Sequence, residues 1–152
     1  MTCSEVFRPA LILGTAQLGM PYGIANTQGQ PDRPAARRLI ETALENGITH
    51  FDTAQAYGDS ERVLGDILEE LRAAADVRIA SKLSAAIDPL DSECVAAAVE
   101  ESFNRLHVER LWCMLLHRPA WLAFWDEGLG EVLRRFRDAG RIEALGVSLG
   151  TV

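Results

Sequence analysis

The chain has 152 residues, 48% of them hydrophobic, which is enough to bury a sizeable core and excludes a disordered chain or a disulfide-stapled miniprotein. Its formal net charge of -7 argues against nucleic acid or an anionic membrane as the main partner, because both need clustered Lys and Arg. No apolar run approaches the ~20 residues of a membrane-spanning helix, so we expect a single cytoplasmic domain over residues 1–152.

Five short apolar runs along the chain predict strands that are buried on both faces. They cover residues 10–13, 48–51, 77–80, 111–116 and 144–149. The strand starts recur about every 30 to 35 residues, which suits both a (β/α)8 barrel and a doubly wound sheet. This spacing alone does not separate the two folds.

Helical periodicity fills the four intervals between these runs. The apolar stripes span residues 36–44, 63–71, 95–106 and 129–136. The first helix is expected to end at Gly47 and the last at Gly140, because glycine takes the left-handed conformation that ends many helices. The third is expected to begin after a cap at Asp91 or Ser92. Alternating strands and helices with short connections predict an α/β protein with parallel strands.

Three cysteines, Cys3, Cys94 and Cys113, are scattered without CxxC spacing. Their odd number predicts reduced thiols, and no His or Cys neighbour lies at the spacing of metal ligands. We therefore predict no metal site.

Four residues of complementary chemistry lie where predicted strands end. Asp52 ends the second strand, Tyr57 lies in the loop after it, Lys82 ends the third strand and His117 ends the fourth. In parallel α/β folds these strand ends meet at the edge that holds the active site. The sequence therefore predicts that the four side chains form one catalytic cluster.

This set of residues suits the reduction of a carbonyl group. Hydride attack on the carbonyl carbon places negative charge on the oxygen, which a Tyr57 hydroxyl could protonate. A neighbouring Lys82 ammonium would stabilise the phenolate, Asp52 would hold that ammonium, and His117 would orient the carbonyl oxygen.

Each of the four also has a structural alternative. Asp52 could cap the turn that follows it, and Tyr57 could pack on the rim of the sheet. Lys82 could be a solvated strand end, and His117 could make only structural hydrogen bonds. Their occurrence together at successive strand ends favours the catalytic interpretation over these structural ones.

The segment from Phe51 to Glu61, Phe-Asp-Thr-Ala-Gln-Ala-Tyr-Gly-Asp-Ser-Glu, followed by Leu64 and Gly65, resembles the signature of the aldo/keto reductase family. Further stretches agree in order and spacing: Leu13-Gly14-Thr15-Ala16, Ala80-Ser81-Lys82, Leu115-Leu116-His117 and Gly146-Val147-Ser148. The resemblance covers nearly the whole chain.

This resemblance implies a parallel (β/α)8 TIM-type barrel and an NADPH-dependent oxidoreductase that reduces an aldehyde or ketone to an alcohol, with Tyr57 as general acid. It is consistent with the absence of a G-x-G-x-x-G motif, since such a barrel binds the nicotinamide cofactor without a Rossmann domain.

The resemblance also implies a cofactor site. Gly14 and Thr15 would approach NADPH through backbone and hydroxyl, Asp52 would reach the nicotinamide ribose, and Ser148 would contact the carboxamide. Leu149 departs from the family, whose members often have Asn there, and it cannot make a second polar contact to the carboxamide.

A full barrel takes about 250 residues, so the sequence predicts an incomplete barrel of about five strands and four helices, apparently truncated. The open edges at residues 10–13 and 144–149 predict self-association. A split protein that pairs with another half barrel and a stable reduced fold remain open. So does a catalytically inactive half barrel acting as a partner or regulatory subunit. An open-sheet nucleotide-binding module is disfavoured, because the first loop lacks Gly-Lys-Ser/Thr chemistry.

The sequence does not identify the carbonyl substrate. Tyr22, Trp121 and Trp125 could line an apolar pocket above Tyr57. Trp125 could equally pack under the last helix.

Overall fold

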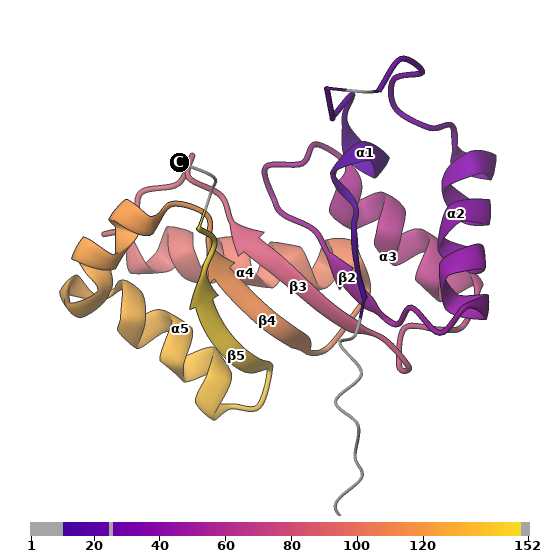
Figure 1. Cartoon of the computed structure of the whole chain (residues 1–152). Coiled ribbons are helices and arrows are strands. Elements are labelled where there is room, and N and C mark those ends of the chain that lie inside the picture. The colour runs from indigo at the N-terminus through magenta and orange to yellow at the C-terminus, as the bar shows by residue number, and fades with distance from the viewer. Residues whose placement is uncertain (1–10, 25, 150–152) are drawn as a thin grey trace, which may run out of the picture.

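Five parallel strands form one sheet in the computed structural model, which describes residues 11–24 and 26–149 (Figure 1). The strands are β1 (Ile12–Gly14), β2 (His50–Asp52), β3 (Arg78–Leu83), β4 (Leu111–Leu116) and β5 (Ile142–Val147). Their order in the sheet is β1-β2-β3-β4-β5, the same as in the sequence. A doubly wound sheet reverses its strand order at a switch point, whereas a (β/α)8 barrel does not. The chain therefore forms part of a barrel, as expected.

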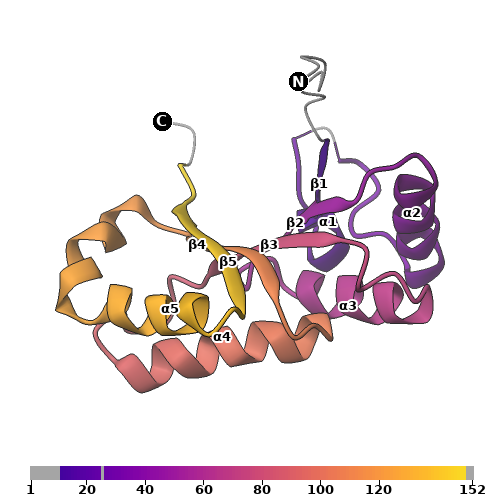
Figure 2. The same cartoon turned by 90° about the horizontal axis from the view of Figure 1, so that it is seen from below.

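Four helices connect successive strands: α2 (Arg33–Glu45), α3 (Ser60–Glu70), α4 (Ser92–Leu106) and α5 (Leu129–Asp138). Figure 2 shows α3, α4 and α5 on the same side of the sheet. This placement follows from right-handed crossovers that all turn the same way, and it leaves the inner face of the partial barrel on the other side. No helix among the described residues is long and apolar enough to cross a membrane.

Capping residues set the helix boundaries, at Asp91 and Gly47 as the sequence predicts and at Asp32, which was not predicted. The Asp91 carboxylate accepts hydrogen bonds from Glu93 N and Cys94 N at the start of α4, both at 3.0 Å. Asp32 accepts from Ala35 N at 2.8 Å at the start of α2. Gly47, just after α2, has a φ of +76°, so the left-handed turn expected there is confirmed.

Several boundaries differ from the sequence-based expectation. A short helix, α1 (Ala16–Gly19), and a 3-10 helix, η1 (Pro119–Glu127), were not predicted. The strand expected at 144–149 lies two residues earlier, and the strand expected at 77–80 continues to Leu83. The start of the first predicted strand, Ala10, lies outside the described residues. The end of β3 was not predicted because the apolar run stops at Ser81 and Lys82. These polar residues are nevertheless buried in the strand, where they have polar partners.

The core lies between the sheet and its helices. Its largest fully buried side chains come from α2, α3, α4, α5 and the helix-facing side of the strands, and include Ile40, Leu64, Leu68, Leu106, Met114 and Leu133. Burial of such apolar surface is the main stabilising term in a domain of this size. This packing fixes the strand ends that carry the polar cluster.

Candidate active site

The four predicted catalytic residues lie at the carboxyl edge of the sheet. Asp52 is the last residue of β2, Lys82 lies one residue before the end of β3, and His117 directly follows β4. Tyr57 lies in the loop between β2 and α3. The structure therefore brings together side chains that are up to 65 positions apart in the sequence (52 to 117).

Lys82 and Asp52 form a tight ion pair. Lys82 Nζ donates to Asp52 Oδ2 at 2.6 Å, to Asp52 Oδ1 at 2.8 Å and to the Thr53 carbonyl oxygen at 2.9 Å. An ammonium group has three donors, so each has an acceptor here. The Lys82 side chain is 6% exposed and that of Asp52 is 32% exposed. The cation is thus fixed in one place while its carboxylate partner stays open to a ligand.

Tyr57 lies against both Lys82 and His117. Lys82 Nζ is 4.8 Å from the centroid of the Tyr57 ring, and the His117 ring meets the Tyr57 ring edge-on with centroids 5.8 Å apart. The ring of Tyr22 lies 6.4 Å from that of Tyr57 on another side. Because the Lys82 donors are directed at Asp52 and Thr53, the ammonium acts on the phenol through its electric field rather than by a direct hydrogen bond.

His117 is biased towards its neutral form. Partial burial lowers its pKa below the ordinary value, and the nearby Lys82 charge lowers it further, while the Asp52 charge acts in the opposite direction. At neutral pH the imidazole therefore offers one N–H donor and one nitrogen acceptor without carrying charge.

A buried hydroxyl network ties the strand ends to the start of α3. Ser60 Oγ donates to the Thr15 carbonyl oxygen at 2.7 Å and lies 2.9 Å from Thr15 Oγ1 and 3.0 Å from Thr53 Oγ1. Thr15 donates to the Asp52 carbonyl oxygen through both its N–H and its hydroxyl, each at 2.9 Å. Asp52 is thus held through its backbone as well as its side chain.

Two glycines let the Tyr57 loop approach α1. A Cβ on Gly19 would lie 1.8 Å from the Tyr57 carbonyl oxygen, and one on Gly58 would lie 2.3 Å from the Gly19 carbonyl oxygen. Gly58 also has a φ of +56°, in the region that favours glycine. Larger residues would push the Tyr57 loop away from the sheet.

Glu61 is a buried carboxylate next to the site that the sequence analysis did not identify. Its side chain is 1% exposed, and its Oε1 accepts from Ser81 Oγ at 2.6 Å. It lies on the helix side of β3, opposite to the side of Lys82. A carboxylate in the first turn of a helix is usually solvated, so only the polar Ser81 within a buried strand could have signalled this contact.

The residues predicted to bind the cofactor lie around the same edge. Gly14 ends β1 and is exposed, and a Cβ added there would meet nothing within 4 Å. Ser148 follows β5, and its N–H donates to the Leu116 carbonyl oxygen at 2.9 Å. Thr15 is 1% exposed, with its hydroxyl engaged by Asp52 and Ser60. Leu149 is largely exposed.

Trp121 and Trp125 contribute to packing. Trp121 is buried in the hydrophobic core. Trp125 packs against α5: a Cβ on Gly130 would lie 2.6 Å from its ring, and the Arg134 guanidinium lies 5.2 Å from the ring centroid. For Trp125, packing against the last helix is the alternative that the structure shows. Of the three aromatic residues expected above Tyr57, Tyr22 is the one whose ring lies next to it.

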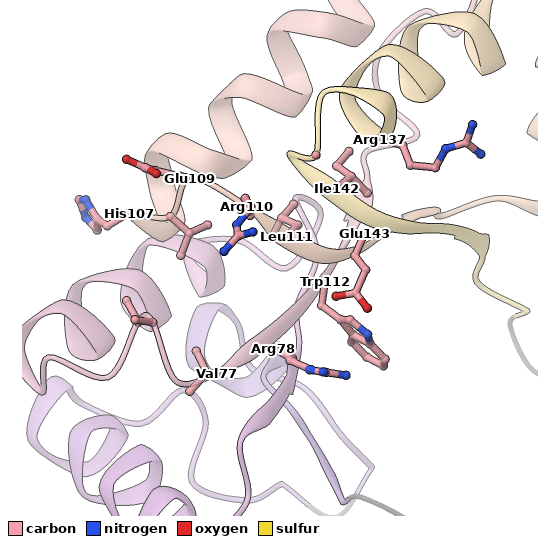
Figure 3. A pocket seen from close by; sticks show the side chains of 14 residues that line it. Val77, Arg78, His107, Glu109, Arg110, Leu111, Trp112, Arg137, Ile142 and Glu143 are labelled. Atoms are coloured by element: carbon pink, nitrogen blue, oxygen red, sulfur yellow. The ribbon is translucent and has the colours of Figure 1, made fainter.

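A cavity of about 720 Å³ lies at the opposite end of the strands (Figure 3). Its walls come from the loops that precede β3, β4 and β5 and from the first residues of these strands, and include Val77, Arg78, Arg110, Trp112 and Glu143. None of the four clustered residues lines it. Among the described residues, no three His, Cys, Asp or Glu side chains gather as a metal site would need.

A partial (β/α)8 barrel with Asp, Tyr, Lys and His at its carboxyl edge defines the class of the protein. Residues 10–152 match the model of the aldo/keto reductase family. The chain belongs to the aldo/keto reductase family.

Comparison with individual relatives and solved structures supports the same family. The chain is 32% identical over 130 residues to the aldo-keto reductase YhdN of Bacillus subtilis, covering 79% of this chain and 38% of the relative. It is 30% identical over 145 residues to aflatoxin B1 aldehyde reductase member 4 of Homo sapiens, covering 93% and 41%. The holo form of aldo-keto reductase AKR11C1 from Bacillus halodurans superposes with a TM-score of 0.72 at 25% identity, covering 91% of this chain and 45% of that one. The chain thus spans about two fifths of the length of these curated relatives.

Proposed function

We propose that this chain carries the catalytic part of an NADPH-dependent reductase that converts an aldehyde or ketone into an alcohol. The observation that carries the proposal is the position of Tyr57, whose ring lies 4.8 Å from the Lys82 ammonium and 5.8 Å from the His117 ring. A proton donor, a fixed cation and a neutral hydrogen-bonding group thus converge at the carboxyl edge of the sheet. Membership of the aldo/keto reductase family supports the same chemistry.

Tyr57 is the general acid of this proposal. NADPH, when bound, supplies the hydride for the carbonyl carbon. The Tyr57 hydroxyl then gives its proton to the carbonyl oxygen, on which negative charge develops, and solvent returns a proton to the phenolate before the next turnover. The Lys82 ammonium lies 4.8 Å from the centroid of the Tyr57 ring, close to where negative charge develops during proton transfer, and Asp52 holds the ammonium in this place.

His117 positions the carbonyl oxygen in this scheme. Because burial and Lys82 keep its pKa low, the imidazole is neutral at neutral pH and does not compete with Tyr57 as the proton source. Its N–H can still donate a hydrogen bond to the carbonyl oxygen. The substrate would therefore be held by two donors, Tyr57 and His117.

The residues around the edge fit the nicotinamide end of NADPH. The empty space above Gly14 admits a flat ring close to the backbone, and Asp52 keeps a third of its side chain open for a ribose hydroxyl. Ser148 would contact the carboxamide. Thr15 would lie beneath the cofactor, where it holds the Asp52 backbone.

Tyr22 supplies an apolar wall next to the reacting centre. The residue is 54% exposed, and its ring lies 6.4 Å from the Tyr57 ring. Gln17 Nε2 and Asn26 Nδ2 donate to the Tyr22 carbonyl oxygen, which fixes its loop. We expect the carbonyl substrate to carry an apolar or aromatic group that packs on this ring.

The experiment is the aldehyde-dependent oxidation of NADPH, with a panel of aldehydes and ketones. It compares the chain alone with the same chain fused to the later strand-helix units of a full-length relative. We expect turnover in the fusion, and slower or no turnover in the chain alone, because later loops add contacts to the cofactor. A fusion that binds NADPH but oxidises it with none of the carbonyl compounds would contradict the proposal.

A second function is favoured by the two edges of the sheet. β1 and β5 each pair with only one neighbour among the described strands, and Ile12 in β1 is 50% exposed. Unpaired edges with apolar side chains promote association. The chain would then act as a catalytically inactive half barrel that binds a partner or a second copy of itself. Sedimentation equilibrium measures this directly, and a monomer at all concentrations would argue against self-association.

A further inference from the structure

Gln55 makes a set of side-chain contacts that no other residue of the Tyr57 loop makes. Its Nε2 donates to the Ala98 carbonyl oxygen at 2.7 Å and to Ser102 Oγ at 2.8 Å, both on α4. Its Oε1 accepts from Ser84 N at 2.7 Å, just beyond β3. One amide therefore joins the loop after β2 to the loop after β3 and to the middle of α4.

The orientation of this amide follows from its partners. The Ala98 carbonyl can only accept a hydrogen bond, and the Ser84 N–H can only donate one. A flipped amide would place oxygen against oxygen and N–H against N–H. The three contacts thus hold Gln55 in one orientation.

Gln55 holds the backbone directly after Lys82, on both sides of Leu83. Its own N–H donates to the Lys82 carbonyl oxygen at 3.2 Å, while its side chain holds Ser84 N. The last register pair of β2 and β3 is Asp52 with Ala80, so these bonds continue the pairing past the end of β2. The position of Lys82 along β3 is therefore linked to the start of the Tyr57 loop.

Tyr57 depends on this loop for its position. Tyr57 N donates to the Ala54 carbonyl oxygen at 3.0 Å, which makes a tight turn directly around Gln55. Among the described residues, the Tyr57 hydroxyl makes no hydrogen bond that would hold the side chain by its tip. The close approach of Gly19 and Gly58 supports the loop on one side, and Gln55 supports it on the other.

We propose that Gln55 is a positioning residue that sets the distance between Tyr57 and the Lys82 ammonium by clamping the loop onto β3 and α4. The catalytic meaning of this clamp rests on the proposed role of Tyr57 as proton donor. The clamp itself is a property of the fold and can be measured without turnover.

The test is nuclear magnetic resonance of the 152-residue chain and its variant Gln55→Met, which keeps the length of the side chain but removes the amide. We expect the Ser84 amide to exchange with solvent up to about tenfold faster, since one hydrogen bond of this kind is worth up to about 1.4 kcal/mol, which is a factor of ten. We also expect the ring contact between Tyr57 and His117 to weaken. The chain has only two tyrosines and three histidines, so these ring signals are readily assigned.

Gln30→Met is the matched control. Gln30 Nε2 makes a single bond, to the carbonyl oxygen of Leu18 in α1, at 2.8 Å. This variant should leave Ser84 exchange and the contact between the Tyr57 and His117 rings unchanged. If Gln55→Met also leaves both unchanged, Gln55 does not position the loop. If Gln55→Met does not fold, Gln55→Glu decides, because it keeps the acceptor for Ser84 N: slow Ser84 exchange supports the clamp, and fast exchange overturns it.

Turnover separates this inference from the proposed function. In an assembly that reduces a carbonyl, Gln55→Met should lower kcat about tenfold and leave KM for NADPH unchanged, because it displaces the proton donor rather than the cofactor. A rise in KM with constant kcat would contradict positioning. If no assembly turns over but the ring contact weakens, the proposed function fails and the clamp stands.

Discussion

Two neighbouring residues of β3, Ser81 and Lys82, each take part in a polar contact that involves a buried ionisable side chain, and the two contacts lie on opposite sides of the sheet. On the helix side, Ser81 donates to Glu61, whose Oε2 has no hydrogen-bond partner among the described residues and lies 3.6 Å from Arg105 Nη1. On the inner side, Lys82 has an acceptor for each of its three donors. The buried charge at the active edge is therefore better satisfied than the buried charge behind it.

The difference lies in which of the two contacts is open to a ligand. The Asp52 carboxylate is a third exposed, so the inner pair borders open space where a ligand can bind. Glu61 is closed off between α3 and β3, and its surroundings leave no room for a substrate. We infer that the inner pair carries function and the outer contact carries stability, and the following variants test that division.

Asp52→Ala should have the largest effect. It leaves the Lys82 ammonium buried with only the Thr53 carbonyl as acceptor, and breaking a fully buried pair costs about 3–5 kcal/mol. Because Asp52 is partly exposed, we expect a loss of about 2 kcal/mol in the free energy of unfolding, measured by urea denaturation. Asp59→Ala, which removes only a surface pair with Arg62, is the control and should cost under about 0.5 kcal/mol. Equal losses in the free energy of unfolding would mean that the pair between Asp52 and Lys82 stabilises the fold no more than a surface pair does.

Glu61→Gln should have an intermediate effect on stability and none on turnover. The amide oxygen can still accept from Ser81, but the new NH2 group faces the Arg105 guanidinium, and we expect a cost of about 1 kcal/mol. Stability is measured by denaturation and kcat by NADPH oxidation in the completed barrel. A tenfold fall in kcat would show that the helix side of β3 takes part in the chemistry.

The smallest effect should be a pH dependence that originates from His117. Burial and Lys82 lower its pKa in the folded chain, so below about pH 6.5 the unfolded chain binds a proton there that the folded chain does not. Folding stability should therefore fall as the pH drops through this range and level off below the folded pKa. His117→Asn should lose this component, seen as a smaller difference in the urea midpoint between neutral and mildly acidic pH. An unchanged difference would contradict the assignment.

Much of the fold could be predicted from the pattern of apolar residues. The strand expected at 111–116 matches β4 in both bounds, and the cap at Asp91 and the stop at Gly47 are confirmed. These features depend on local chemistry, namely buried periodicity, a capping carboxylate and a left-handed glycine. The boundaries that were missed depend on contacts from distant segments.

In the candidate site, too, the residues that depend on contacts from distant segments were missed. The strand-end rule brought Asp52, Lys82 and His117 to one edge without knowledge of the structure. Glu61 and Gln55 could not be found in this way, because their partners lie 20 to 47 positions away and neither residue ends a strand. Short helix α1 was missed because its glycine-containing segment lacks helical periodicity, although Ala16 and Leu18 are buried by tertiary packing.

The most direct test of the central claim is the effect of Tyr57→Phe on two quantities in the completed barrel, the Kd for NADPH and the rate of aldehyde reduction. Tyr22→Phe is the matched control and should leave the rate within a few-fold, since its ring is retained. If Tyr57 is the proton donor, the Kd should stay the same while the rate falls about 10²- to 10⁴-fold, the usual contribution of a general acid. An unchanged rate would contradict the account, because another group would then supply the proton.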